Sequence, residues 1–356
     1  MDRIFVRGWV FAAHESEIRE PGDWITRQLG NESVIVVSDR DGSVNVMANR
    51  CSHHGTALCW EHRGNSTWFQ CSYHAWTFGL DVEVRSIPFP SGYDRDKAEL
   101  GLDAAGQIES YRGFVFVNLD GTAGPLSDRL GTAGFALIDR LCDLSPTGEI
   151  YLSKGWIAHR VQSNWKLWPE SDSDGYHVGF VHASMSAATD SYYDDVAVGG
   201  EAVSKSRALD CGLGHIELDF RPSYQTELAW LGPTSEPLGP GEMIHRHTAV
   251  QFEGVDDRFN QRLLRQTEAA VGPASFITSD DAVTAERIQS GIGGTHSSWA
   301  AGCKGWIDLS RGQHRATRDE QGVLIAHLSD ETSNRGFWRR YLEVMTEREP
   351  LVEVRP

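Results

Sequence analysis

Two short segments near the N-terminus each place a cysteine beside a histidine. One residue separates Cys51 from His53, two separate Cys71 from His74, and seventeen residues (54–70) lie between the half-sites. Thiolate and imidazole are ligands of zinc and of iron–sulfur clusters. Each segment supplies one thiolate and one imidazole, which suits a two-iron cluster with two cysteines on one iron and two histidines on the other. Neutral imidazole ligands raise the reduction potential of such a cluster above that of an all-cysteine cluster. A zinc site remains the alternative for the same four residues.

A second group of candidate metal ligands lies in the middle of the chain. His177 and His182 are five positions apart, which on a regular helix separates their side chains by about 140° of azimuth. We therefore expect a helix end or a local bulge that brings the two rings together. Asp174 lies one turn before His177 and can accept a hydrogen bond from its free ring nitrogen. The spacing alone also suits two ordinary histidines.

A carboxylate would complete a mononuclear iron site, because a triad of two histidines and one carboxylate leaves one face open for O2 and substrate. The best candidates are Asp280 and Asp281 in the segment GPASFITSDD. Thr278 or Ser279 just before them would also suit an ordinary helix start, where acidic side chains interact favourably with the helix dipole.

Taken together, these segments resemble the large (α) subunit of the Rieske non-haem iron aromatic-ring-hydroxylating oxygenases. CSHHG and CSYHAW are similar to the cluster boxes of that family, and NWK followed by Glu, Asp, Tyr, His and His is similar to its iron box. The family aspartate corresponds to Asp281, with Asp280 as the second choice. The resemblance implies these ligands: Cys51, His53, Cys71 and His74 for a [2Fe-2S] Rieske cluster, and His177, His182 and Asp281 for a mononuclear Fe(II).

The resemblance also implies a function in the catabolism of aromatic hydrocarbons. The chain would be a terminal dioxygenase that uses O2 as co-substrate and converts an aromatic ring to a cis-dihydrodiol. Electrons would come from NAD(P)H through a separate reductase, with or without a ferredoxin, and pass through the Rieske cluster. Asp174 would act in catalysis by linking His177 to His74 of the neighbouring subunit in a ring-shaped trimer.

The late segment RGFWRRYLEVM resembles the C-terminal helix of α subunits that associate with a small β subunit. The resemblance therefore implies an α3β3 or α3 assembly.

Three other functions fit part of the pattern. A Rieske monooxygenase that hydroxylates a ring or removes a methyl group would have identical metal ligands. An electron-transfer Rieske protein would need only the first four ligands and leaves the His–His–Asp set unexplained. A zinc-binding interaction protein would be colourless when purified, whereas a Rieske cluster is red-brown.

A ring substrate requires a mainly apolar pocket. The candidates are apolar residues near the ligands in sequence and a histidine in a Gly-His element that resembles one in the family: Phe180, Val181, Val271, Phe276 and His215.

The elements that must position these residues fall into two regions. The first 120 residues are dense in glycine and in short apolar runs such as VIVVSD and YRGFVFVNL, typical of an all-β module. Helical stretches are predicted over about 165–185, after Ser279 and over 333–346, with strand-like alternation between 204 and 252. This element order predicts an α+β chain.

The resemblance assigns two domains. Residues 1–130 would form an all-β Rieske [2Fe-2S] domain, whose first few residues can pack on the catalytic domain. Residues 131–356 would form the mononuclear iron domain, with a large antiparallel sheet covered by helices in a helix-grip-like arrangement.

The composition limits the partners and the compartment. With 50 acidic and 33 basic residues, the formal net charge is −17, which repels nucleic acid. No apolar run approaches the roughly 20 residues that a membrane span needs, and the N-terminus has no apolar signal region. We expect a cytoplasmic protein that binds neither nucleic acid nor a membrane.

Overall fold

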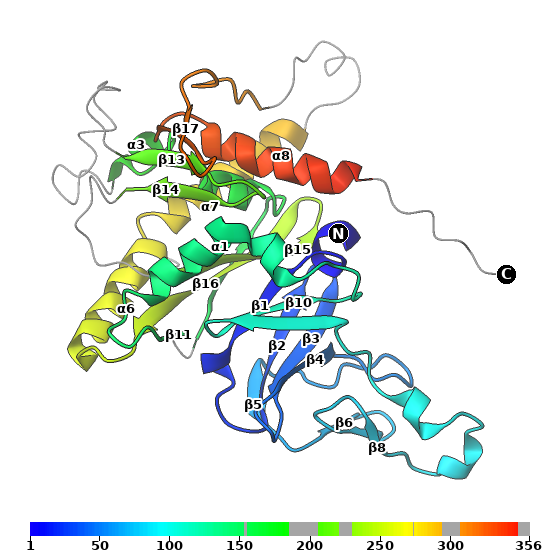
Figure 1. Ribbon diagram of the computed structural model, residues 1–356. Helices are drawn as coiled ribbons and strands as arrows, with labels where there is room; N and C mark the ends of the chain where they lie inside the picture. The colour runs from blue at the N-terminus through cyan, green and yellow to red at the C-terminus, as the bar shows by residue number, and fades with distance from the viewer. Residues whose placement is uncertain (153–154, 185–205, 221–229, 273, 294–306, 348–356) are drawn as a thin grey trace, which may run out of the picture. The chain divides into compact units, whose positions relative to one another are not determined.

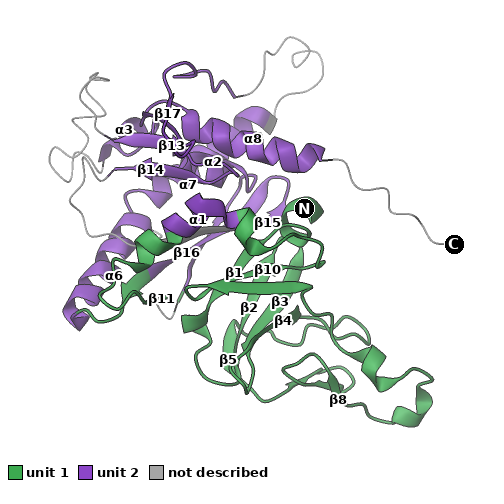
Figure 2. Cartoon of the chain, viewed as in Figure 1, with its two compact units in different colours: residues 1–129, 138–155, 250–255 green, residues 130–137, 156–249, 256–356 purple. Residues whose placement is uncertain are grey.

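A computed structural model describes residues 1–152, 155–184, 206–220, 230–272, 274–293 and 307–347 (Figure 1). The chain forms two compact units (Figure 2). Unit 1 comprises residues 1–129, 138–155 and 250–255, and unit 2 comprises residues 130–137, 156–249 and 256–356. In the described part of the chain, no helix is long and apolar enough to cross a membrane.

Unit 1 is built on three small antiparallel sheets. In order across each sheet, the strands are β1 (Val10–His14), β10 (Phe114–Asn118) and β9 (Gln107–Tyr111); β4 (Val44–Ala48), β3 (Glu32–Ser38), β2 (Asp23–Leu29) and β5 (Arg63–Asn65); and β6 (Phe69–Gln70), β7 (Thr77–Phe78) and β8 (Val84–Ser86). Short helical turns lie between them: η1 (Asp2–Val6), η2 (Glu15–Glu17), η3 (Pro90–Gly92) and η4 (Lys97–Leu100). The strand β11 (Ile150–Leu152) pairs with residues 250–252.

The strand β3 supplies side chains to two separate cores. Its residues 34–37 are all buried apolar side chains, and successive side chains of a strand point to opposite faces. Ile35 and Val37 enter the core cluster that also contains Cys51 and Cys71. The alternate residues of the strand enter a second cluster on the other face. The run VIVV therefore anchors the cysteine loops to the centre of unit 1.

Unit 2 combines two antiparallel sheets with helices. In the first sheet β16 (Glu242–Phe252) pairs with both β12 (Ile157–Val161) and β15 (Trp230–Gly239). The second sheet has the order β14 (Ile216–Asp219), β13 (Arg207–Asp210), β18 (Leu324–His327) and β17 (Thr317–Arg318). The helices are α1 (Leu126–Cys142, shared with unit 1), α2 (Leu167–Asp172), α3 (Val178–Val181), α6 (Asp257–Val271), α7 (Thr278–Gly293) and α8 (Thr332–Thr346).

Helices α2 and α7 pack on one face of the first sheet. Val161 of β12 lies opposite Met243 of β16, and both join a buried cluster with Trp168 of α2 and Ala285 of α7. Helix α8 packs against the second sheet, beside β13 and β14 (Figure 1). The first sheet thus holds α2, which precedes the histidine motif, and α7, which carries Asp281.

The predicted α+β class is confirmed, with an N-terminal β unit followed by antiparallel sheets and helices. Helices α7 and α8 begin within one or two residues of their predicted starts. The continuous helix expected over about 165–185 is instead the two short helices α2 and α3, and Met185 lies outside the described residues. Asp174 ends the helical run because its carboxylate accepts a hydrogen bond from the Tyr176 amide (2.6 Å), which competes with the helix.

Candidate metal centres

Two loops of the same backbone design hold the first group of candidate ligands. In the loop after β4, the Cys51 amide donates to the carbonyl five residues later (2.8 Å), and its carbonyl accepts from Gly55 (2.8 Å). Cys71 makes the equivalent bonds in the β6–β7 loop at 2.8 and 3.0 Å, with Ala75 in the place of Gly55. Both of these residues have positive φ, +75° and +56°. The loops therefore hold their two cysteines in equivalent backbone positions, with His53 two residues after the first and His74 three residues after the second.

The thiols and the imidazoles of these loops lie at different depths. Cys51 and Cys71 are 2% and 3% exposed, whereas His53 is half-buried and His74 is exposed. The two imidazole centroids are 4.7 Å apart. This separation of thiols from imidazoles fits a cluster with thiolates on one iron and imidazoles on the other.

The nitrogen atoms of His53 also fit a cluster ligand. Its Nδ1 is buried and has no hydrogen-bond partner among the described residues, although buried polar atoms are normally paired. Its Nε2 lies 3.4 Å from the hydroxyl oxygen of Tyr93. Trp76 stacks on the ring, with centroids 4.6 Å apart and planes 3° apart. The ring is thus held with one nitrogen left for a metal.

The backbone around the two thiols favours a thiolate at Cys71. Burial raises the pKa of Cys51. Burial also disfavours the Cys71 thiolate, but the backbone N–H groups of Tyr73 and His74, together with the side chains of Cys51 and Thr56, outweigh it and lower the pKa of that thiol. The Tyr73 amide nitrogen lies 3.5 Å from Cys71 Sγ. Amide donors aimed at a sulfur stabilise negative charge there, which suits a cluster ligand.

Helix α3 brings the two central histidines together. It has only four residues, with His177 immediately before it and His182 immediately after it. His182 leaves the helical conformation at φ −96° and ψ 29°, and the two ring centroids are 5.3 Å apart. The helix end that the five-residue spacing required is therefore present.

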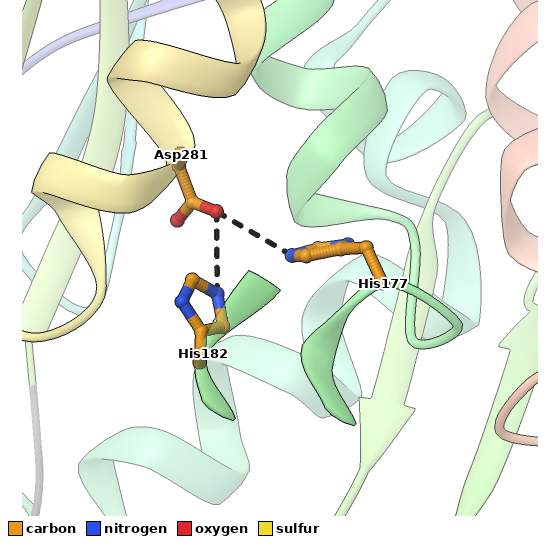
Figure 3. A group of neighbouring side chains, drawn as sticks. All are labelled: His177, His182 and Asp281. Carbon is orange, nitrogen blue, oxygen red and sulfur yellow. Dashed lines mark ion pairs between the residues drawn. The ribbon is translucent and has the colours of Figure 1, made fainter. Parts of the chain in front are cut away.

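Asp281, in the first turn of α7, lies between these two rings. Its Oδ1 is 3.4 Å from Nε2 of His177 and 3.2 Å from Nε2 of His182 (Figure 3). One ligand atom from each residue lies within 4.8 Å of the others, and no second set of three such residues converges this closely in the described part of the chain. Two imidazoles and one carboxylate are the donor set of a mononuclear ferrous site.

Asp280 faces the other side of His182. Its Oδ2 lies 3.7 Å from Nδ1 of His182, the nitrogen that is not directed at Asp281. A carboxylate in this position can orient a ligand imidazole. The geometry therefore favours Asp281 over Asp280 as a ligand.

Negative charge gathers around His177. Its Nδ1 lies 3.2 Å from Oδ2 of Asp174. Burial alone would lower the pKa of His177, but Asp174 and Asp281 outweigh it and raise that pKa to about 10. Burial, with a smaller contribution from Asp174, raises the pKa of Glu170 to about 7. Such perturbed groups cluster at functional sites, and here they favour a bound cation.

The residues predicted to line the substrate pocket have different environments. Phe180 and Phe276 are 63% and 49% exposed, and Val271 at the end of α6 is buried. Val181 and His215 are half-buried.

Three histidines that lie together on the first sheet of unit 2 were not predicted. They are His159 on β12 and His245 and His247 on β16, and His245 stacks on Trp168 with centroids 3.8 Å apart. The His-x-His alternation in EMIHRHTAVQF could have indicated the last two, because alternate residues of a strand share a face.

Known proteins resemble this chain in both sequence and fold. The Rieske [2Fe-2S] domain family matches residues 8–110. The large subunit of anthranilate 1,2-dioxygenase from Acinetobacter baylyi is 30% identical over 89% of this chain and 78% of that protein. The α subunit of an N,N-dimethyl phenylurea N-demethylase from a Sphingobium species is 38% identical over 96% of this chain and 87% of that protein. A crystal structure of naphthalene 1,2-dioxygenase with bound indole matches with a TM-score of 0.81 and 26% identity, covering 96% of this chain and 88% of that one.

The match to the Rieske domain family, together with the fold and the dioxygenase relatives, shows that this chain is an oxidoreductase of the Rieske type. The chain belongs to the Rieske non-haem iron oxygenases, as a large (α) subunit.

Proposed function

We propose that the two groups of ligands hold the two iron centres of a terminal oxygenase. The cluster ligands would be Cys51, His53, Cys71 and His74, in a Rieske domain over residues 1–130, and the Fe(II) ligands would be His177, His182 and Asp281, in a catalytic domain over residues 131–356. The observation that carries this proposal is the position of Asp281 Oδ1, which lies within 3.4 Å of both Nε2 atoms.

The proposed reaction is the conversion of an aromatic ring to a cis-dihydrodiol. When bound, the cluster supplies an electron relay and the ferrous ion supplies a place to activate O2. The chain's own residues supply three ligands, and such a triad leaves one face open for O2 and substrate. Asp174 holds Nδ1 of His177, so that Nε2 faces the metal position. The relative named anthranilate 1,2-dioxygenase supports this reaction class.

The electrons for this reaction would come from NAD(P)H through a separate reductase, with or without a ferredoxin. In a trimer, α3 or α3β3, Asp174 would join His177 to His74 of the neighbouring subunit and carry electrons between the two centres. The names "large subunit" and "subunit alpha" of the relatives support a smaller β subunit.

A second candidate reaction is oxidative N-demethylation. One relative is named an N-demethylase and is 38% identical over 96% of this chain. N-demethylation places one oxygen atom on a methyl group, which then leaves as formaldehyde, and it needs the same metal ligands.

A single-turnover experiment separates these candidates. The purified assembly is reduced without air, mixed with aromatic acids, anilines, N-methyl amides or fused-ring hydrocarbons, and exposed to ¹⁸O-labelled O2. A diol that carries two labelled atoms is the result expected for the dioxygenase. Formaldehyde or a product with one labelled atom would establish the monooxygenase instead, and a colourless protein that binds zinc would overturn both.

A further inference from the structure

One face of the first sheet of unit 2 carries a group of polar side chains whose hydrogen-bonding atoms are buried. His159 of β12 lies opposite His245 of β16, and His247 lies two residues further along the same face of β16. Ser235 of β15 lies opposite His245 from the other side. The centroids of the three imidazoles are 5.4, 5.5 and 6.0 Å apart. We call these four residues the histidine patch.

The histidine patch contains hydrogen-bonding atoms that the chain does not pair. Nε2 of His159, Nδ1 of His245, both ring nitrogens of His247 and Oγ of Ser235 are buried without a hydrogen-bond partner among the described residues. His245 is 4% exposed and His247 is 1% exposed. An unpaired buried donor or acceptor loses its hydrogen bonds to water and gains none in return, which destabilises the fold. A folded protein tolerates few such atoms, and several on one face point to a partner that comes from outside the chain.

The histidine patch lies beside the proposed iron site. Trp168 of α2 stacks on His245, and α2 is the helix that leads into the turn at Asp174. Helix α7, which carries Asp281, packs against β12. The charge of Asp281 also acts on His245. A substrate bound next to the iron would therefore meet this face of the sheet.

The patch suits hydrogen bonding better than metal binding or charge recognition. Among the described residues, the ring nitrogens of these three histidines do not converge within 4.8 Å of one another as the ligand atoms of His177, His182 and Asp281 do. Burial, reinforced by the neighbouring histidines, lowers the pKa of His245 to about 2 and that of His247 to about 4. A neutral imidazole has one N–H donor and one acceptor nitrogen. The patch thus offers both donors and acceptors and carries no positive charge at neutral pH.

We propose that the histidine patch forms the polar end of the substrate pocket and selects a neutral aromatic substrate whose substituent both donates and accepts hydrogen bonds, such as an aryl amide or aryl urea. This inference rests on the proposed function, since it names the substrate class of that site. A benzoate-type carboxylate would find no cation in the patch. A plain hydrocarbon would leave the imidazole nitrogens of the patch unpaired. Such a pocket would have a polar end in addition to the apolar lining that the sequence predicts.

Binding measurements test the proposal without requiring turnover. Acetanilide, benzoate and propylbenzene present an amide, a carboxylate and a hydrocarbon on the same ring. Their dissociation constants are measured by calorimetry with the reduced, anaerobic holoenzyme. Acetanilide is expected to bind about tenfold or more tightly than the other two, because only it can pair the patch.

Variants of His247 then test whether the patch itself binds acetanilide. His247→Leu removes two unpaired nitrogens and is expected to weaken acetanilide binding about tenfold or more, whereas His247→Gln keeps a donor and an acceptor and retains part of the affinity. His247→Leu is also expected to raise the melting temperature, because the cost of the unpaired atoms disappears. The matched control is His62→Gln, a substitution of an exposed histidine in unit 1, which should change neither quantity.

Two results would overturn the proposal. The first is equal affinity for the three ligands, or no binding of acetanilide, in the unmodified enzyme. The second is unchanged acetanilide affinity in His247→Leu together with a lower melting temperature, which would make the patch structural packing. The ¹⁸O experiment is independent of both, so oxygenated product from any aromatic compound would leave the proposed function standing while this inference failed.

Discussion

Oδ2 of Asp174 lies 3.2 Å from Nδ1 of His177. The same carboxylate accepts the Tyr176 amide through Oδ1 at 2.6 Å, so the turn itself holds it in place. Because Asp174 occupies one ring nitrogen, the other is left to face Asp281. Asp174, which is not itself a proposed iron ligand, thus sets the orientation of the proposed ligand His177.

Replacing Asp174 by Asn tests this link. The amide can keep a hydrogen bond to His177 but carries no charge, so we expect both iron centres to remain and turnover to fall roughly 10–100-fold. The measurement is the rate at which the reduced cluster loses electrons when substrate and O2 are added, followed by its visible absorption. Full turnover with both centres bound would contradict the proposed electron path.

Asp281 and Asp280 form a matched pair for testing the iron site. Asp281→Asn should abolish binding of the mononuclear iron, lowering the iron content from about three to about two atoms per chain, while the cluster spectrum stays unchanged. Asp280→Asn should leave that iron bound with affinity reduced roughly 10–100-fold, because Oδ2 of Asp280 lies 3.7 Å from Nδ1 of His182, where it can orient the ring but faces the nitrogen that is not directed at Asp281. Iron analysis and titration with Fe(II) measure both. The reverse order of effects would make Asp280 the ligand.

The cluster assignment has an equally direct test. Cys51→Ser should yield a protein without the red-brown colour, because a serine replaces one of the two thiolate ligands. Cys59→Ser is the control: this cysteine packs against the same core, and burial raises the pKa of its thiol to about 12, which keeps it neutral. Visible absorption and acid-labile sulfide measure both variants. Colour that persists in Cys51→Ser would remove that residue from the ligand set.

The sequence was most informative where the chemistry is local. Each cysteine–histidine pair lies within one turn, and Asp174 lies three residues from His177, so these relationships depend little on the rest of the fold. The break between α2 and α3 was not predicted, because it depends on the Asp174 side chain replacing a helical hydrogen bond.

The histidine patch could not be derived in the same way. It exists because β12 and β16 pair in the register that sets His159 opposite His245. A shift by one residue would move His159 away from that face. Long-range register of this kind depends on packing against α2 and α7, which no single segment of the sequence reveals.

Gly175 fixes the turn between Asp174 and His177 by its lack of a side chain. A Cβ atom there would lie 2.6 Å from the carbonyl oxygen of Leu328 and 2.5 Å from its side chain. We expect Gly175→Ala to destabilise the protein by about 1–3 kcal/mol and to weaken Fe(II) binding, because the turn must move. Gly291→Ala is the control, since a Cβ there meets nothing within 4 Å. Urea unfolding and Fe(II) titration would contradict this role if the two variants behaved alike.

His247 should make stability depend on pH below neutrality. Burial, reinforced by His159, lowers its pKa to about 4 from the ordinary value of 6.5. Between these two pH values the unfolded chain binds more protons than the folded one, so the free energy of unfolding falls as the pH falls from 6.5 towards 4. At pH 5 this group should account for a loss of up to about 2 kcal/mol relative to pH 7.

The variant His247→Leu isolates this contribution, because it leaves every carboxyl group in place. Urea titrations at pH 7 and pH 5 should give a smaller loss of unfolding free energy in His247→Leu than in the unmodified protein. His62→Gln, which replaces an exposed histidine of unit 1, should keep the full loss, since it leaves His247 in place. An identical loss in all three proteins would mean that folding does not change the pKa of His247. The folded imidazole would then be protonated at pH 5, and a charged imidazole in the patch would favour an anionic substrate over a neutral one at that pH.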